Sequence, residues 1–413
     1  MYIKKDKATV FLTLIIVVIF CECNGMRLFR ISDDTYRLIL LIVLTFFACL
    51  LLVDTKLIRK DWGKWYVFYL VIIFCFVICE FVYTTHLYTG LSTYDFLNGM
   101  KHYMYLFSVP LLIYLFYEEG MKRTLDCVSV LVTISHLFLI LHALLYNNTE
   151  SGFLQMDLYT SRTLIRNGRL RIWDLSSLEG LAILWCWFSF QNSRKGRIKY
   201  FLQTVICMSA LFYVEQTRMM QIAMIICLVM MMLCKKASHR VEILVKLFLV
   251  ISGIYFGSMI TEYYWKSIFD VGTRHLNYSS SVRLSELHFI SRVVAEKGIW
   301  GIGMIPVSLQ QRLFLSWNYI GLSLDDVGLI GYFALAGIWI VPIFIMPLFR
   351  YTKFVIFSWH KQQESIFCAT LLVYLLITST TLFVLDRVRF LMWPFVIAIF
   401  EYENTRINVK GDG

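Results

Sequence analysis

The chain has 413 residues, of which 59% are hydrophobic and 16% aromatic, and its mean hydropathy of +0.67 excludes an ordinary soluble globule. The formal net charge of +11 is not carried by a basic soluble domain, so we expect no nucleic-acid partner. Most of the 11 cysteines lie in apolar runs, where a thiol behaves as a small hydrophobe. We therefore infer no disulfide framework and no metal site, and we expect no cofactor.

Apolar runs separated by short charged clusters extend along the whole chain. Each run is close to the length that crosses about 30 Å of hydrocarbon. The sequence therefore predicts an all-α, polytopic integral membrane protein with one membrane domain over residues 1–413. In chain order the twelve predicted spans are 8–23, 38–53, 65–83, 103–117, 125–146, 178–190, 200–214, 219–234, 241–260, 326–349, 366–385 and 388–402.

Two segments need comment before the chain is threaded. The first run resembles a signal peptide, but it has no small-residue cleavage site and more spans follow, so we count it as the first helix. Run 178–190 is short for a span, and segment 84–101 also fits a re-entrant structure. An even number of spans places both termini on the same side.

The cations divide unequally between the two sides of the threaded chain. One set of helix ends carries 14 Lys and 7 Arg, which is the usual cytoplasmic excess, so both termini are expected in the cytoplasm. The opposite set carries 14 Arg and only 3 Lys. Because the guanidinium group stays charged and forms paired hydrogen bonds with phosphate, the far side predicts a site for an anionic, phosphorylated substrate. Contact with lipid headgroups is the alternative for these arginines.

Two far-side loops, 147–177 and 261–325, exceed the usual turn length and are expected to be functional. Within the second loop, segment 282–297 reads as an amphipathic helix. Helical spacing places Arg283 with Glu286 on one face and His288 with Arg292 on another. Its predicted apolar stripe consists of Leu287, Ile290 and Val294.

A short turn between two spans places Thr217 and Arg218 close to hydrocarbon depth, where an unpaired charge is costly and usually functional. A local ion pair with Glu215 is the alternative. Later in the chain, Asp325 or Asp326 could serve as a base or a substrate anchor, or one of them could simply cap a helix.

Several other polar residues fall in apolar runs or beside them. His136 and His142 are expected to be packed residues more often than catalytic ones, and no partner is evident for the carboxylate of Glu80. Gly328 and Gly331 should allow the tenth span to pack closely against a neighbour.

Four local patterns together resemble the bacterial O-antigen ligase and O-antigen polymerase superfamily. They are the Thr217-Arg218 turn, Arg283-x3-Leu287 followed by Gly-Ile-Trp-Gly-Ile-Gly, Asn318-x9-Gly328-x-x-Gly331, and the pairs Arg169-x10-Gly180 and Arg292-x10-Gly303. The matches cover about 115 residues of the chain, and the Arg-x10-Gly pairs are the least specific of them. Ser316 stands where the ligase motif has histidine, which favours a polymerase.

The resemblance implies an inner-membrane glycosyltransferase that joins undecaprenyl-pyrophosphate-linked repeat units of a surface polysaccharide without a metal. Arg218 and Arg283 would hold the donor pyrophosphate, and Arg169, Arg171 and Arg292 would orient donor or acceptor, beside Ser316 and Asn318. The general base stays open among Asp325, Asp326, Glu286 and His288. Donor and acceptor lipids, membrane lipids and a chain-length regulator protein are the expected partners. The alternatives are an O-antigen ligase acting on a lipid A core or protein, a flippase for lipid-linked oligosaccharide, and a structural partner in polysaccharide export.

Overall fold

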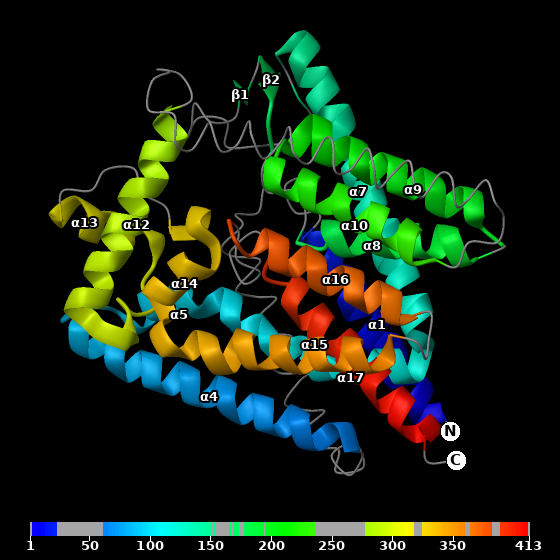
Figure 1. Ribbon diagram of the computed structural model, residues 1–413, viewed down its shortest axis with the longest axis horizontal. Coiled ribbons are helices and arrows are strands. Elements are labelled where there is room, and N and C mark those ends of the chain that lie inside the picture. Colours follow the sequence, from blue (N-terminus) through cyan, green and yellow to red (C-terminus); the bar gives the residue numbers. More distant parts are fainter. Residues whose placement is uncertain are drawn as a thin grey trace.

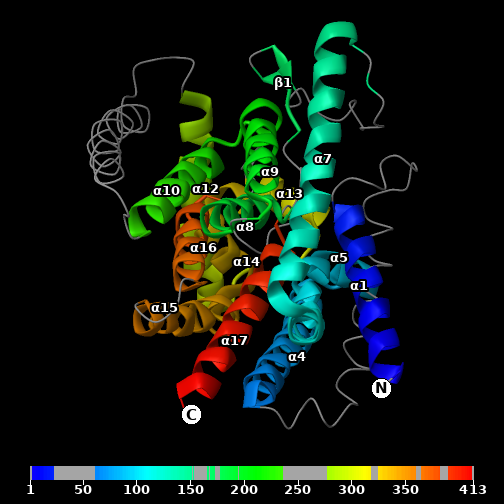
Figure 2. The same ribbon diagram turned by 90° about the vertical axis from the view of Figure 1, so that its right-hand side faces the viewer.

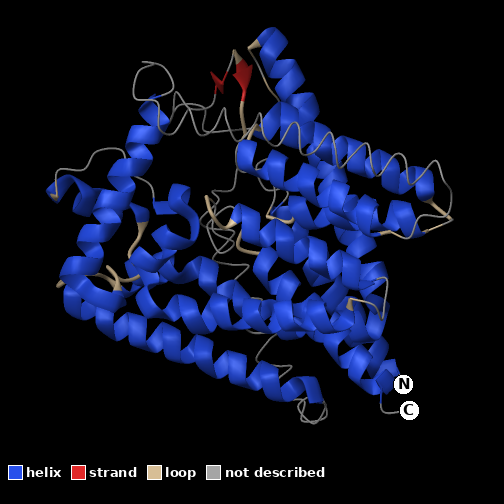
Figure 3. Ribbon diagram, viewed as in Figure 1, coloured by secondary structure: helices blue, strands red, loops and turns tan. Residues whose placement is uncertain are grey.

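The computed structural model describes residues 2–22, 61–150, 152, 165–166, 168–172, 177–193, 195–235, 277–317, 324–359, 364–381 and 389–411. Its described part is mostly helical, and the strands within it form one two-stranded hairpin (Figures 1 and 3). Among the described residues, three helical stretches are long and apolar enough to cross a membrane: Thr93–Thr149, Arg197–Glu215 and Val341–Ser358. The all-α class is therefore confirmed, with helices of the kind that membrane proteins use.

The described elements follow the predicted runs in order, and two predicted spans, 38–53 and 241–260, lie outside the described residues. The α-helices and strands are α1 (Tyr2–Glu22), α4 (Asp61–Leu87), α5 (Thr93–Met104), α6 (Val109–Leu115), α7 (Met121–Thr149), β1 (Ile165–Arg166), β2 (Arg169–Leu170), α8 (Glu179–Asn192), α9 (Arg197–Ala210), α10 (Arg218–Cys234), α12 (Asn277–Lys297), α13 (Val307–Ser316), α14 (Gly328–Ala336), α15 (Met346–Ser358), α16 (Glu364–Thr378) and α17 (Met392–Gly411). Short 3-10 or π turns connect or extend several of them: η2 (Tyr105–Ser108), η3 (Phe116–Gly120), η5 (Leu211–Glu215), η6 (Gly298–Trp300), η7 (Leu324–Val327), η8 (Gly337–Trp339) and η9 (Val341–Ile345).

The arrangement brings the first and last helices to the same end of the molecule. The start of α1 and the end of α17 lie at the lower end of the molecule in both views (Figures 1 and 2). Segment 84–101 contains the end of α4 and most of α5, and α5 continues through η2 into α6. The predicted span 326–349 is not one straight helix, because Gly337 breaks it at a φ of +54°.

The close packing against a neighbour predicted for Gly328 and Gly331 is present at Gly328, whereas Gly331 packs on η7, the turn directly before its own helix. A Cβ atom on Gly328 would lie 2.2 Å from the carbonyl oxygen of Ser379, and one on Gly331 would lie 2.0 Å from that of Leu324. The amide of Leu329 donates to the same Ser379 carbonyl at 2.9 Å. Glycine at 328 therefore lets α14 begin directly against the end of α16, where no side chain fits.

An extended segment, 301–306, is buried among the helices beside this break. Its amides at Ile302 and Gly303 donate to the carbonyls of Ala334 and Leu335, at 2.8 and 3.1 Å. Non-helical backbone in an apolar bundle must satisfy its polar groups within the protein, and the break at Gly337 is adjacent to the carbonyls that do so.

Helix α4 completes the support of this extended segment. Tyr83 and Tyr88 donate hydroxyl hydrogen bonds to the carbonyls of Gly301 and Ile302, and the amide of Met304 donates to the hydroxyl oxygen of Thr84 at 3.2 Å. Glu80, one turn earlier, accepts from Thr84 and also contacts the Met304 backbone. The carboxylate of Glu80 therefore has a partner in segment 301–306, which was not evident from the sequence.

We expect Thr84→Val to destabilise the protein by about 1–3 kcal/mol, because it removes the buried hydroxyl that accepts from the Met304 amide and donates to Glu80. Thr85→Val is the matched control, since the Thr85 hydroxyl donates to carbonyls of its own helix at Phe81 and Val82. Thermal unfolding in detergent measures both. Equal midpoints for the two variants would contradict the assigned role of Thr84.

Candidate functional site

The β1–β2 hairpin anchors one of the predicted arginine loops to the helical bundle. Ile165 pairs with Leu170 and Arg166 with Arg169, and Gly168 in the turn has a φ of +72°. After β2, the amide of Ile172 donates to the carbonyl of Val214 at 3.0 Å. The hairpin is thereby held against η5, the last turn before α10 (Figure 1).

The end of α7 holds the other side of the hairpin. The side-chain oxygen of Asn147 accepts from the amide of Leu170 at 2.7 Å, and its side-chain nitrogen donates to the Tyr213 hydroxyl at 3.1 Å. One amide side chain therefore ties α7, β2 and η5 together. The hairpin is therefore attached to the bundle by a backbone hydrogen bond from Ile172 and by the side chain of Asn147.

Three of the predicted arginines lie on the segments that form this junction. Arg169 is exposed and its guanidinium lies 5.5 Å from the centre of the Tyr213 ring. Arg171 is half-buried, and its Nε donates to the carbonyl of Glu215 at 2.9 Å. Arg218 is exposed at the first residue of α10. The structure thus brings Arg169 and Arg171 to the turn that precedes Arg218, although the hydrogen-bonded residues Arg171 and Glu215 are 44 positions apart in the chain.

The side chain of Glu215 turns inward instead of pairing with Arg218. It is 2% exposed and contacts Glu179, the first residue of α8, which is 1% exposed. Glu179 in turn lies 3.6 Å from Nε2 of His136, a fully buried residue of α7. This distance is longer than a hydrogen bond.

Arg389 completes the buried cluster from the segment just before α17. It is 2% exposed and acts electrostatically on Glu215 and on Tyr374 of α16. The Tyr374 ring lies against Gly180, where a Cβ atom would be 2.4 Å from it. We name His136, Glu179, Glu215, Tyr374 and Arg389 the buried polar cluster.

The buried polar cluster is costly in an apolar bundle. An isolated ionised group would pay a desolvation penalty of several kcal/mol, so acids and bases in such a place occur together and usually serve a function. Here Arg171 bonds to the backbone of Glu215, and Arg169 lies two residues earlier on the exposed hairpin. The arrangement can hold Arg169 and Arg171 at the surface, while the buried carboxyl groups of the cluster offset their charge and orient them.

The arginine helix of the second loop is present but its buried face differs from the prediction. α12 begins at Asn277, earlier than expected. Leu287 and Val294, placed on the apolar stripe, are 44% and 41% exposed. The prediction is wrong for these two, because Phe289 and Val293 form the buried face with Ile290, and Phe289 packs on aromatic rings of α13 and the residue after it.

The polar residues of α12 separate as the helical spacing predicts. Glu286 is fully buried on the packed face, whereas His288 is exposed. Arg292 is exposed, pairs with Glu296 at 2.8 Å and lies 4.5 Å from the centre of the Trp317 ring. Glu286 and His288 therefore do not address a common ligand.

The remaining predicted site residues are only partly described. Ser316 ends α13, is exposed and donates to the carbonyl of Leu313 at 2.8 Å. The backbone of Arg283 lies in α12 and that of Asp325 and Asp326 in η7, while their side chains, and all of Asn318, lie outside the described residues. α12 begins at the same end of the molecule as the β1–β2 hairpin in both views (Figures 1 and 2).

Sequence reasoning missed Glu179 and left Arg389 unassigned, and it treated His136 as packing. A signal existed. Alternating spans place Glu179, Glu215 and Arg389 at the same far-side end, each next to the first or last position of an apolar run. Among the described residues, no group of three or more His, Cys, Asp or Glu side chains could hold a metal ion. No protein-family model matches the chain, and no curated protein matches it.

Proposed function

We propose that the protein is an inner-membrane polymerase of a bacterial surface polysaccharide, related to the O-antigen polymerases. It would transfer a glycan from one undecaprenyl pyrophosphate to a hydroxyl group on a second lipid-linked repeat unit, at the outer face of the membrane. In that reaction the bond between the anomeric carbon and the pyrophosphate oxygen breaks. A bond from the same carbon to the acceptor oxygen forms, and the hydroxyl proton passes to a base.

The observation that carries this proposal is the junction whose segments carry Arg169, Arg171 and Arg218. Donors fixed next to a leaving pyrophosphate stabilise the charge that develops on it, and a pyrophosphate is a weak base that needs no strong acid. The hydrogen bond from Arg171 to the Glu215 carbonyl holds the Arg171 guanidinium in place before a substrate binds. Arg283 would add a further donor from α12, and Arg292 would orient the glycan.

We expect Arg218→Ala to lower the rate of polymer formation by about 10²–10³-fold, the usual cost of removing one preorganised donor to a developing anion. Arg312→Ala, an exposed arginine of α13 outside the junction, should leave the rate unchanged. Polymer extracted from cells that carry either variant, separated by length on a gel, measures the effect. Equal length distributions in the two strains would refute a pyrophosphate role for Arg218.

A second candidate, the flippase for lipid-linked oligosaccharide, is favoured by the buried polar cluster. Buried ionisable residues contributed by several helices are the mark of a transport pathway. Deletion of the gene separates the candidates. A polymerase deletion leaves single repeat units capped on the cell surface, a flippase deletion retains them on the cytoplasmic side, and a ligase deletion leaves long polymer on the carrier lipid.

A further inference from the structure

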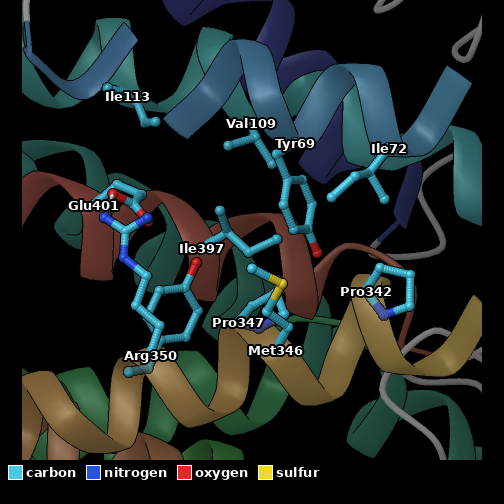
Figure 4. Close-up of a pocket in the computed structure, with 11 residues that line it drawn as sticks. Tyr69, Ile72, Val109, Ile113, Pro342, Met346, Pro347, Arg350, Ile397 and Glu401 are labelled. Atoms are coloured by element: carbon cyan, nitrogen blue, oxygen red, sulfur yellow. Dashed lines mark hydrogen bonds and ion pairs between the residues drawn. The ribbon is translucent and has the colours of Figure 1, made fainter. Parts of the chain in front are cut away.

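A largely apolar hollow lies between α4, α6, α15 and α17, away from the arginine junction (Figure 4). Ile72, Val109, Ile113 and Ile397 contribute aliphatic walls, and Met346 lies across its middle. The Tyr69 hydroxyl donates to the carbonyl of Ile343, so its polar group is already satisfied. The interior of the hollow therefore suits a hydrocarbon chain.

The charged groups of the hollow are confined to one end. Arg350 and Glu401 meet there, with nitrogen and oxygen 2.8 Å apart (Figure 4). A second hollow shares Arg350 and Glu401 with the first and continues to Lys353 and Asn404. An occupant that fills both would have a hydrocarbon chain inside and a polar group among two cations and one anion.

The outer surface of α15 is apolar at this level. Phe349, Ile356 and Phe357 are among the most exposed large hydrophobic side chains of the described chain. Exposed apolar side chains beside Arg350 and Lys353 are typical of a helix that crosses from hydrocarbon into the headgroup region. The hollow therefore lies beside a surface of α15 that membrane lipids would contact.

From these contacts we propose that the hollow binds one acyl chain of an anionic phospholipid, with the headgroup phosphate at Arg350 and Lys353. Two cations against the single carboxylate of Glu401 leave a net positive charge, which favours an anionic over a zwitterionic headgroup. The site is far from the β1–β2 hairpin (Figures 1 and 2), so it is separate from the proposed substrate site and does not depend on that function.

The test is native mass spectrometry of the delipidated full-length protein with phosphatidylglycerol or phosphatidylethanolamine added. We expect at least tenfold more retained phosphatidylglycerol than phosphatidylethanolamine. Ile397→Trp, which fills the hollow, should abolish the difference, whereas Ile356→Trp on the exposed face of α15 should not.

Three results would overturn the proposal. They are equal retention of the two lipids, equal retention of phosphatidylglycerol by the Ile397→Trp and Ile356→Trp variants, and displacement of bound phosphatidylglycerol by equimolar undecaprenyl phosphate. The last result would assign the hollow to the carrier lipid instead. Because Ile397→Trp can perturb folding, Lys353→Gln on the exposed surface provides a second variant, and it should reduce the preference for the anionic lipid at least threefold.

Discussion

Replacing Arg389 by methionine should destabilise the protein by about 3–5 kcal/mol, the range measured when one partner of a buried ion pair is removed. Arg389 is 2% exposed and lies among the carboxyl groups of the buried polar cluster. Without it, the half-buried Arg171 is the one nearby cation that still acts on Glu215 among the described residues. The midpoint of thermal unfolding in detergent, followed by labelling of buried thiols such as Cys227, measures the loss.

A double variant tests whether the loss comes from charge or from volume. Adding Glu215→Gln to Arg389→Met removes a carboxylate and should recover about 0.5–3 kcal/mol, the usual coupling between neighbouring charged groups. Arg312→Met, on the exposed surface of α13, is the control and should leave the midpoint unchanged. If Arg389→Met behaves like Arg312→Met, the buried polar cluster is not an electrostatic unit.

Gly328→Ala should have an effect of similar size for a steric reason. The new methyl group would lie 2.2 Å from the Ser379 carbonyl oxygen, at a φ of +56°. The left-handed conformation alone costs about 1–2 kcal/mol, and overpacking typically adds about 1–3 kcal/mol. Because Ser379 also accepts from the amide of Leu329, relief of the clash would break that contact.

Gly298→Ala isolates the conformational part of this cost. Gly298 has a φ of +63°, but a methyl group there would meet no atom within 4 Å. We expect this variant to lose only the backbone contribution, so its unfolding midpoint should lie between those of the wild type and Gly328→Ala. Equal midpoints for the two alanine variants would show that α14 does not depend on close contact with α16.

The order of the described helices was predictable because apolar length is a strong signal. The predicted runs 65–83, 125–146 and 219–234 correspond to α4, α7 and α10. Helices α4 and α7 extend a few residues beyond the run at both ends, and α10 begins one residue earlier. The break at Gly337 and the buried segment after Gly301 were not predictable. They depend on hydrogen bonds between residues more than 30 positions apart, which hydropathy does not report.

The candidate site was predictable in part. The arginine pattern identified Arg169, Arg171 and Arg218, but not their convergence, because that depends on the docking of β2 against η5. The carboxyl groups beneath them were overlooked, since each is a single polar residue at the end of an apolar run. The packing of α8 on α7 brings Glu179 to His136, and the segment before α17 brings Arg389 to Glu215.

The most direct test of the proposed function is elongation of a synthetic lipid-linked repeat unit by the purified protein. The protein in detergent or nanodiscs is supplied with an undecaprenyl-pyrophosphate-linked repeat unit, and the products are separated by mass. We predict a ladder of glycans that grow by whole repeat units, with release of undecaprenyl pyrophosphate and a strong reduction in Arg218→Ala. A wild-type protein that binds the substrate but yields neither longer glycan nor free carrier would contradict the proposal.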